Sequence, residues 1–140
     1  MGEKLTDSAE ILFRQVHPDL MHDGVPSSSI FCPTQDDDNQ LSVDRSALTN
    51  AESSHTLYTS GGRSSTAVFG ITVSEFEENN ISCHSDALEA TDTAPANAAH
   101  ALANFEMHGS SKQKAIAKKL KRAAVARGQL HPKMAPMREE

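Results

Sequence analysis

Several features that would indicate a particular class of protein are missing from this sequence. No tryptophan is present, tyrosine occurs once, and aromatic residues make up 4% of the 140 residues, so we expect a modest core of Leu, Ile, Val, Ala and a few Phe. No apolar run approaches the roughly 20 residues that span a bilayer. The first ten residues, MGEKLTDSAE, are acidic where a signal peptide is basic and then apolar. We therefore expect a cytoplasmic protein with no membrane partner.

Cysteine and the common ligand-binding motifs are equally scarce. Cys32 and Cys83 are too few for a disulfide framework, and we interpret them as reduced thiols, with a single disulfide as the alternative. The chain lacks C-x-x-C and H-x-x-x-H spacings, and the adjacent Cys83 and His84 would project to opposite sides of a strand. It also has no Walker, G-x-G-x-x-G or G-x-S-x-G motif. We predict neither a metal site nor a cofactor.

Length and charge define the organisation of the chain. A chain of 140 residues fits one domain, and we predict a flexible arm at 1–9, a single domain at 10–128 and a flexible tail at 129–140. The formal charge of −6 argues against a protein that covers nucleic acid with its whole surface. A local basic patch is still compatible with this charge.

Alternation and helix-capping patterns predict an α+β fold. Residues 10–17 predict a strand that Pro18 ends, and short strands are expected at 30–31, 41–43, 81–84 and 99–107. The apolar run 67–73 predicts a strand in the middle of the sheet. Capping boxes at 49–52 and 74–77 predict two short helices, and a longer basic C-terminal helix is expected at 112–127, ended by Gly128. We predict a small, mainly antiparallel sheet, because 31–41 is too short for the crossover of a doubly wound fold.

Arg14 is the first candidate functional residue. An arginine within a core strand is costly unless it pairs with a carboxylate, a phosphate or a ligand. The serines of the loop at Ser27, Ser28 and Ser29 would add hydroxyls and amides to an anion site, and His17 stands at the end of the same strand. The alternatives are an exposed Arg, a turn His that leaves the other face of the strand, and a polar serine turn.

His100 is the second candidate. It falls on the polar face of the strand at 99–107, where Asn104 or Glu106 would orient the imidazole. A group with a pKa near neutrality transfers protons at working pH. Arg14, His17 and His100 are therefore the candidate catalytic residues if the chain is an enzyme, which the residues leave open; an exposed structural histidine is the alternative.

The C-terminal helix carries seven of the thirteen Lys and Arg residues. Its apolar stripe is narrow and consists of Ile116, Leu120, Ala123 and Ala124. The cationic side chains Lys118, Lys119, Lys121 and Arg122 are the candidate residues for binding an acidic protein partner or RNA or DNA. The alternative is a docked amphipathic helix whose solvated face is cationic.

Several runs carry a resemblance to other proteins. LFRQVHP, SSSIFCP, LSV and NAAHAL, with a basic helix ending in AVARG, resemble a group of small uncharacterised bacterial proteins over roughly 12–130, and this resemblance implies no activity. A looser similarity is to compact ADP-ribosyltransferase-type toxins, which place an Arg on the first strand and a Ser or Thr motif later. Arg14 with 27–29 or 64–66 would match them, whereas their usual Glu has only the alternatives Glu75, Glu77 and Glu106.

Two hypotheses from different classes follow. The first is a small cytoplasmic bacterial interaction or accessory protein that binds an acidic protein or nucleic acid through the basic C-terminal helix. The second is a toxin-like enzyme, such as one of a toxin–antitoxin pair, that acts on RNA or NAD in the manner of a ribonuclease or an ADP-ribosyltransferase. Arg14 would then bind phosphate, and His100 or His17 would move protons.

Overall fold

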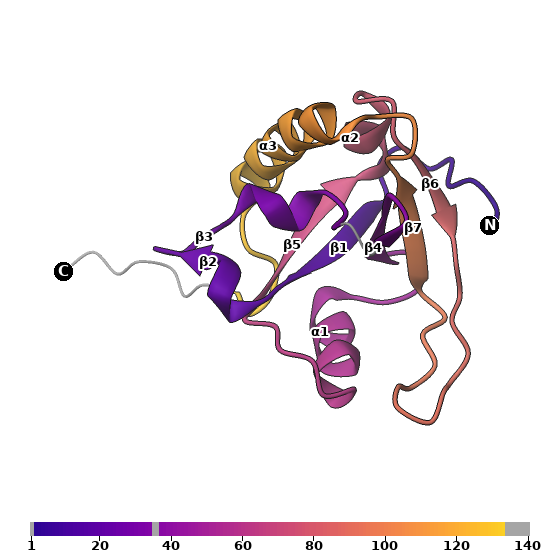
Figure 1. Cartoon of the computed structure of the whole chain (residues 1–140). Coiled ribbons are helices and arrows are strands. Elements are labelled where there is room, and N and C mark those ends of the chain that lie inside the picture. Colours follow the sequence, from indigo (N-terminus) through magenta and orange to yellow (C-terminus); the bar gives the residue numbers. More distant parts are fainter. Residues whose placement is uncertain (1, 35–36, 134–140) are drawn as a thin grey trace.

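The computed structural model describes residues 2–34 and 37–133. At its centre is a five-stranded sheet with the order β5-β1-β4-β7-β6, in which all neighbours are antiparallel (Figure 1). The strands are β1 (Ile11–Val16), β4 (Gln40–Arg45), β5 (Ala67–Thr72), β6 (Ser82–Ser85) and β7 (His100–Asn104). A separate hairpin is formed by β2 (Met21–His22) and β3 (Val25–Pro26). The predicted α+β fold with a mainly antiparallel sheet is confirmed.

Helices cover both faces of the sheet. One face carries α3 (Ser110–Arg127), the short α2 (Val73–Glu77) and the 3-10 helix η2 (Ser28–Phe31), while α1 (Ala51–Ser60) lies on the opposite side (Figure 1). A second 3-10 turn, η1 (Pro18–Leu20), follows β1. No helix of the described residues is both long and apolar enough to cross a membrane.

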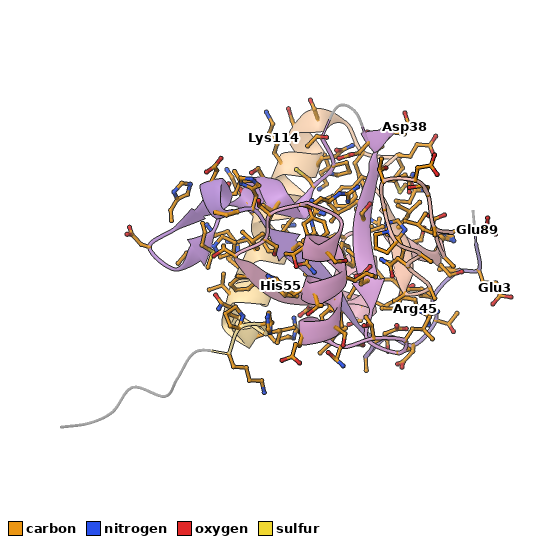
Figure 2. The ribbon with its side chains drawn as sticks, turned by 90° about the horizontal axis from the view of Figure 1, so that it is seen from below. Glu3, Asp38, Arg45, His55, Glu89 and Lys114 are labelled. Carbon is orange, nitrogen blue, oxygen red and sulfur yellow. The ribbon has the colours of Figure 1, made fainter. Side chains whose placement is uncertain are left out.

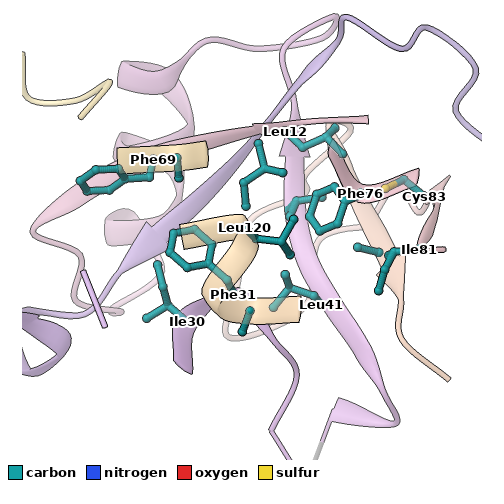
Figure 3. Close-up of a cluster of buried hydrophobic side chains, with 14 of the residues drawn as sticks. Leu12, Ile30, Phe31, Leu41, Phe69, Phe76, Ile81, Cys83 and Leu120 are labelled. Carbon is teal, nitrogen blue, oxygen red and sulfur yellow. The ribbon is translucent and has the colours of Figure 1, made fainter. Parts of the chain in front are cut away.

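The hydrophobic core lies between the sheet and α3. Phe31, Phe76 and Leu120 are among its fully buried side chains, and they pack with Leu12 and Leu41 from the sheet (Figure 3). The buried side of α3 is the predicted stripe with small changes: Ala123 is half-buried, whereas Gln113 and Ala117 are buried. The amide of Gln113 donates to Asn39 Oδ1 and to the carbonyls of Phe105 and His108, which satisfies this buried polar group.

Two strand predictions were wrong. Residues 30–31 belong to η2, because the Ser27 hydroxyl accepts from the Ser29 amide at 3.3 Å and starts a helical turn. The apolar run 67–73 forms β5, which is an edge strand and not a central one. Its free edge is covered by the backbone of Leu130 and His131, which bonds to Val68. An edge strand covered in this way has the composition of a central one.

The helix starts also differ from prediction. The N-cap of α1 is Asn50, whose Oδ1 accepts from the Ser53 amide at 2.8 Å, so the expected box at Thr49 does not form. The capping box of α2 lies two residues earlier than expected and joins Thr72 and Glu75. In both cases the sequence offered neighbouring capping residues, and the register of the preceding strand selected one of them.

Segments just outside both ends of the predicted domain, 10–128, lie against the sheet. Leu5, within the segment expected to be an arm, is buried, and its amide donates to the Cys83 carbonyl of edge strand β6 at 2.8 Å. Leu130 and His131, within the expected tail, lie beside β5 as described above. The remainder of that tail, 134–140, is outside the described residues. Leu5 and the segment 130–131 thus lie along opposite edges of one sheet.

Candidate anion-binding cavity

A cavity of about 440 Å³ opens on the α1 side of the sheet. Strands β1, β4 and β7 form its floor, α1 forms one wall, and the long connection from β6 to β7 forms the other. In Figure 1 this connection extends beside α1. The volume falls within the range of small-molecule binding sites, and Arg14 and His100 both line it.

Arg14 lies where two strands of the sheet separate. The β1–β4 ladder contains only the pairs Leu12–Arg45 and Phe13–Asp44. Beyond them, Arg14 Nη1 donates to the Ser42 carbonyl at 3.2 Å, and Nε donates to the Ile30 carbonyl of η2 at 2.6 Å. Because Ser42 and Asp44 face the same neighbouring strand, the guanidinium bonds a carbonyl that a longer ladder would have used.

Arg14 has no ion-pair partner in the part of the chain that the structure describes. Among the described residues no carboxylate lies within 4.0 Å of its guanidinium, and none accepts from Nη2. The Arg14 side chain is half-buried. Burial lowers the pKa of Arg14, while Tyr58 and Asp37 act in the opposite direction. An arginine nevertheless stays protonated in proteins, so a partly desolvated cation borders the cavity.

His100 contributes an oriented imidazole to the same cavity. Its Nδ1 lies 3.0 Å from Asp86 Oδ2 and 3.1 Å from the Asp86 carbonyl, and its side chain is 12% exposed. Nδ1 carries the proton in this arrangement, because both neighbours are acceptors. The predicted orienting residues Asn104 and Glu106 do not take this role: Asn104 bonds Gln40, and Glu106 lies beyond the end of β7. Asp86 and His100 form a pair of the kind that fixes imidazoles for proton transfer.

A hydrogen-bonded chain of polar side chains fixes the floor of the cavity. The Ser65 hydroxyl donates to Gln15 Oε1 at 2.7 Å, Gln15 Nε2 donates to Ser54 Oγ at 2.9 Å, and Ser54 Oγ donates to Asp44 Oδ2 at 2.6 Å. Asp44 Oδ1 accepts from Asn97 Nδ2 at 2.9 Å. The chain links α1, two strands and the β6–β7 connection, so both walls are held at a fixed separation.

Two further side chains add a cation and an aromatic ring. Tyr58 and Arg63 line the cavity from α1 and from the segment that follows it, and the Arg63 guanidinium lies 5.3 Å from the centre of the Tyr58 ring. Arg63 is exposed, whereas Tyr58 is half-buried. The lining therefore has two arginines, one imidazole, one phenol and the carboxylate of Asp44, together with apolar walls from Leu57, Leu88, Ala94 and Pro95.

The other predicted site residues lie elsewhere. His17 caps η1, where its Nδ1 accepts from the Asp19 amide at 3.1 Å. Ser27 and Ser29 share a hydrogen bond at the start of η2, and Ser28 is the first residue of that turn. None of the four lines the cavity. Arg14 reaches the Ile30 carbonyl of η2 and no serine hydroxyl.

The predicted partner-binding residues belong to α3 on the other side of the sheet. Lys118, Lys119 and Arg122 are exposed and Lys121 is half-buried. None of the four pairs with a carboxylate among residues 2–34 and 37–133. By contrast, Arg127 bonds both oxygens of Glu75 and the Gly70 carbonyl, so this cation is structural.

Several residues that line the cavity or contact its lining were not found from the sequence. Asp86, Asn97 and Tyr58 come from a loop and a helix whose positions depend on how the chain packs, and no local motif marks them. Arg63 follows two glycines and is indistinguishable from an ordinary turn residue. Asp44 could have been found from the sequence. It continues the short strand at 41–43, and a carboxylate within a strand of the core needs a partner for the same reason that Arg14 does.

Comparisons with known proteins give no match. No protein-family model matches the chain, and neither curated proteins nor solved structures contain a match. The resemblances given above on sequence runs therefore remain predictions. Among the described residues, no cluster of three or more His, Cys, Asp or Glu side chains is arranged to hold a metal ion.

Proposed function

We propose that the protein binds a small organic anion in the cavity between α1 and the β6–β7 connection. The observation that carries this proposal is Arg14, which lines the cavity and whose guanidinium has no ion-pair partner among the described residues. A partly buried cation is costly when it stays unpaired, and a phosphate or carboxylate of a ligand would provide the missing charge. Planar guanidinium groups bind both anions in a bidentate manner.

The remaining lining supports an anion that carries an apolar body. Arg63 and Tyr58 offer further donors, whereas Leu57, Leu88 and other apolar side chains form the walls. A free inorganic ion would leave most of about 440 Å³ to water. Ligand sites generally combine apolar walls with a few fixed polar groups, so the ligand class that fits is a phosphate or carboxylate on a hydrophobic or aromatic group.

Phenyl phosphate is a suitable probe for the test. Calorimetric titration of the full chain should show saturable binding, with phenol as the neutral control. The Arg14→Gln variant should bind about tenfold to a hundredfold more weakly, because a charge-assisted hydrogen bond contributes about 1.5–3 kcal/mol. The Lys118→Gln variant removes one positive charge from the opposite side and should leave the affinity unchanged. Equal binding by wild type and Arg14→Gln would contradict the proposal.

Arg14 also donates hydrogen bonds to β4 and η2. Its substitution can therefore destabilise the fold, and a second variant serves as the control. Arg63→Gln changes an exposed residue of the cavity and leaves the core untouched. It should weaken phenyl phosphate binding with an unchanged melting temperature. If Arg14→Gln loses binding because it unfolds, Arg63→Gln still reports whether an arginine of the cavity contacts the anion. Unchanged binding in a folded Arg63→Gln would restrict the anion to Arg14.

One observation favours an enzyme as the second candidate. His100 lines the same cavity as Arg14, and Asp86 fixes its Nδ1. A fixed imidazole beside an anion-binding arginine is suited to proton transfer on a bound phosphate ester. Expression of the wild type in a bacterial host should then slow growth, and Arg14→Ala and His100→Ala should relieve the effect. Equal growth of all three strains would argue against a toxin-like enzyme and leave the binding proposal intact.

A further inference from the structure

The exposed side of α3 carries a strip of three cations. Lys114, Lys118 and Arg122 recur every four residues, so their side chains line one side of the helix over about 12 Å. All three are exposed, and none pairs with a carboxylate among the described residues. We call these three residues the cationic strip. Lys112 and Lys119, which are also exposed, lie beside it.

The cationic strip does not stabilise the helix that carries it. Like charges four residues apart repel each other, and cations near the start of a helix oppose its dipole. Yet α3 has no acidic residue anywhere, none in its first turn, and no side chain that caps its N-terminus. Its stability comes from the buried stripe that includes Ile116 and Leu120. A merely solvated face would tolerate charges of alternating sign at least as well, so the uniform charge indicates a partner.

The rest of the chain is strongly acidic by comparison. Outside α3, six Lys and Arg residues stand against nineteen Asp and Glu residues. Some of these acids border the strip. Gln113 bonds Asn39, which brings the neighbouring Asp37 and Asp38 to the first turn of α3, and Figure 2 shows Asp38 and Lys114 at the same end of the molecule. A second cavity of about 320 Å³ places Glu75 and Glu78 beside Lys119.

This arrangement selects a short partner over a long polyanion. Charges are felt over about 8 Å at physiological ionic strength, so a nucleic acid strand that overran the strip would meet the acidic residues at its borders. An acidic protein segment of two or three helical turns matches the length of the strip and ends before them. We infer that the cationic strip of α3 binds a short acidic segment of a partner protein.

The inference is independent of the proposed anion cavity, because α1 residues line the cavity and α1 and α3 lie on opposite sides of the sheet (Figure 1). A fluorescent peptide of about eight glutamates, which is about 12 Å long as a helix, is the probe, and a single-stranded DNA of about equal charge is the comparison. Binding to the full chain is measured by anisotropy at rising salt concentrations. The test variant is Lys118→Glu with Arg122→Glu, and the matched control is Lys4→Glu with Lys133→Glu, which alters two exposed lysines by the same total charge.

The wild type should bind the glutamate peptide more tightly than the DNA, with an affinity that falls as salt rises. The strip variant should lose at least tenfold in affinity, and the matched control should change less than threefold. Equal loss in both double variants would mean that only net charge matters, and this would overturn the inference. Tighter binding of the DNA would also overturn it. A wild type that sediments as a dimer, and becomes monomeric only in the strip variant, would replace the partner with a second copy of the chain.

Discussion

At the scale of single residues, burial decides which groups can react. Cys83 is fully buried, and burial raises its pKa to about 12, with the carboxylates of Glu77 and Glu10 acting in the same direction. Burial also raises the pKa of Cys32, but Arg14 and Lys114 act against it, and this thiol is only half-buried. The two cysteines are free in the structure, as the sequence predicted, yet they should differ sharply in reactivity.

We expect a thiol reagent such as DTNB to modify one cysteine of the folded protein at pH 8. With a pKa of about 12, Cys83 is a thiolate in about one molecule in ten thousand at that pH, and only the thiolate reacts. Absorbance should report one slow equivalent from native wild type and none from Cys32→Ser. Both thiols should react in guanidinium chloride. Two equivalents from the native protein would show that Cys83 is accessible.

At the scale of secondary-structure elements, an ion pair joins α2 to the end of α3. Arg127 donates to both carboxylate oxygens of Glu75 at 3.0 and 2.9 Å. Burial alone would raise the pKa of Glu75, but the hydrogen bonds from Arg127 and Thr72 outweigh it, and the pKa lies below its usual value. A carboxyl whose pKa is lowered by folding stabilises the protein above its unfolded pKa, and this contribution is lost as pH falls through the folded value.

The Glu75→Gln variant should therefore lose about 1–2 kcal/mol of unfolding free energy at pH 7, in line with a partly exposed charged hydrogen bond. The difference from wild type should shrink as pH falls below the ordinary glutamate pKa of about 4.3 and through the lower pKa that Glu75 has in the folded protein. Denaturant titrations at the two pH values measure both quantities. Glu78→Gln alters the exposed neighbour and should change stability by less than about 0.5 kcal/mol. A pH-independent deficit in Glu75→Gln would contradict the role of its charge.

Elements were predicted well where the signal is local. The strand that ends before Pro18 and the helix that ends at Gly128, which has a φ of 98°, follow from residue chemistry alone. The prediction of a central position for 67–73 was wrong, because an apolar pattern indicates that a strand is buried but not which segment buries it. Here the source is a later segment, 130–131, that covers the edge of β5. The helical turn at 28–31 was missed because a two-residue apolar pair fits either conformation.

At the scale of the whole molecule, charge and shape are divided between the two sides of one sheet. The core and the cationic strip lie on the α3 side, and the cavity with Arg14, Tyr58 and His100 lies on the α1 side. Arg14 and His100 could be named from the sequence, each as an unusual residue in its strand. Their neighbours could not, because Asp86 reaches His100 only through the long β6–β7 connection, and Tyr58 reaches the cavity only through the packing of α1.

The central claim is that Arg14 is an unneutralised cation that receives an anion, and NMR of the arginine side chains tests it most directly. The Nε–Hε signal of Arg14 is assigned by its absence in Arg14→Lys, and phenyl phosphate is then titrated into the wild type. The signals of Arg14 and Arg63 should shift together and saturate, while that of Arg122 on the opposite side stays in place. A constant Arg14 signal in protein saturated with phenyl phosphate would contradict the account.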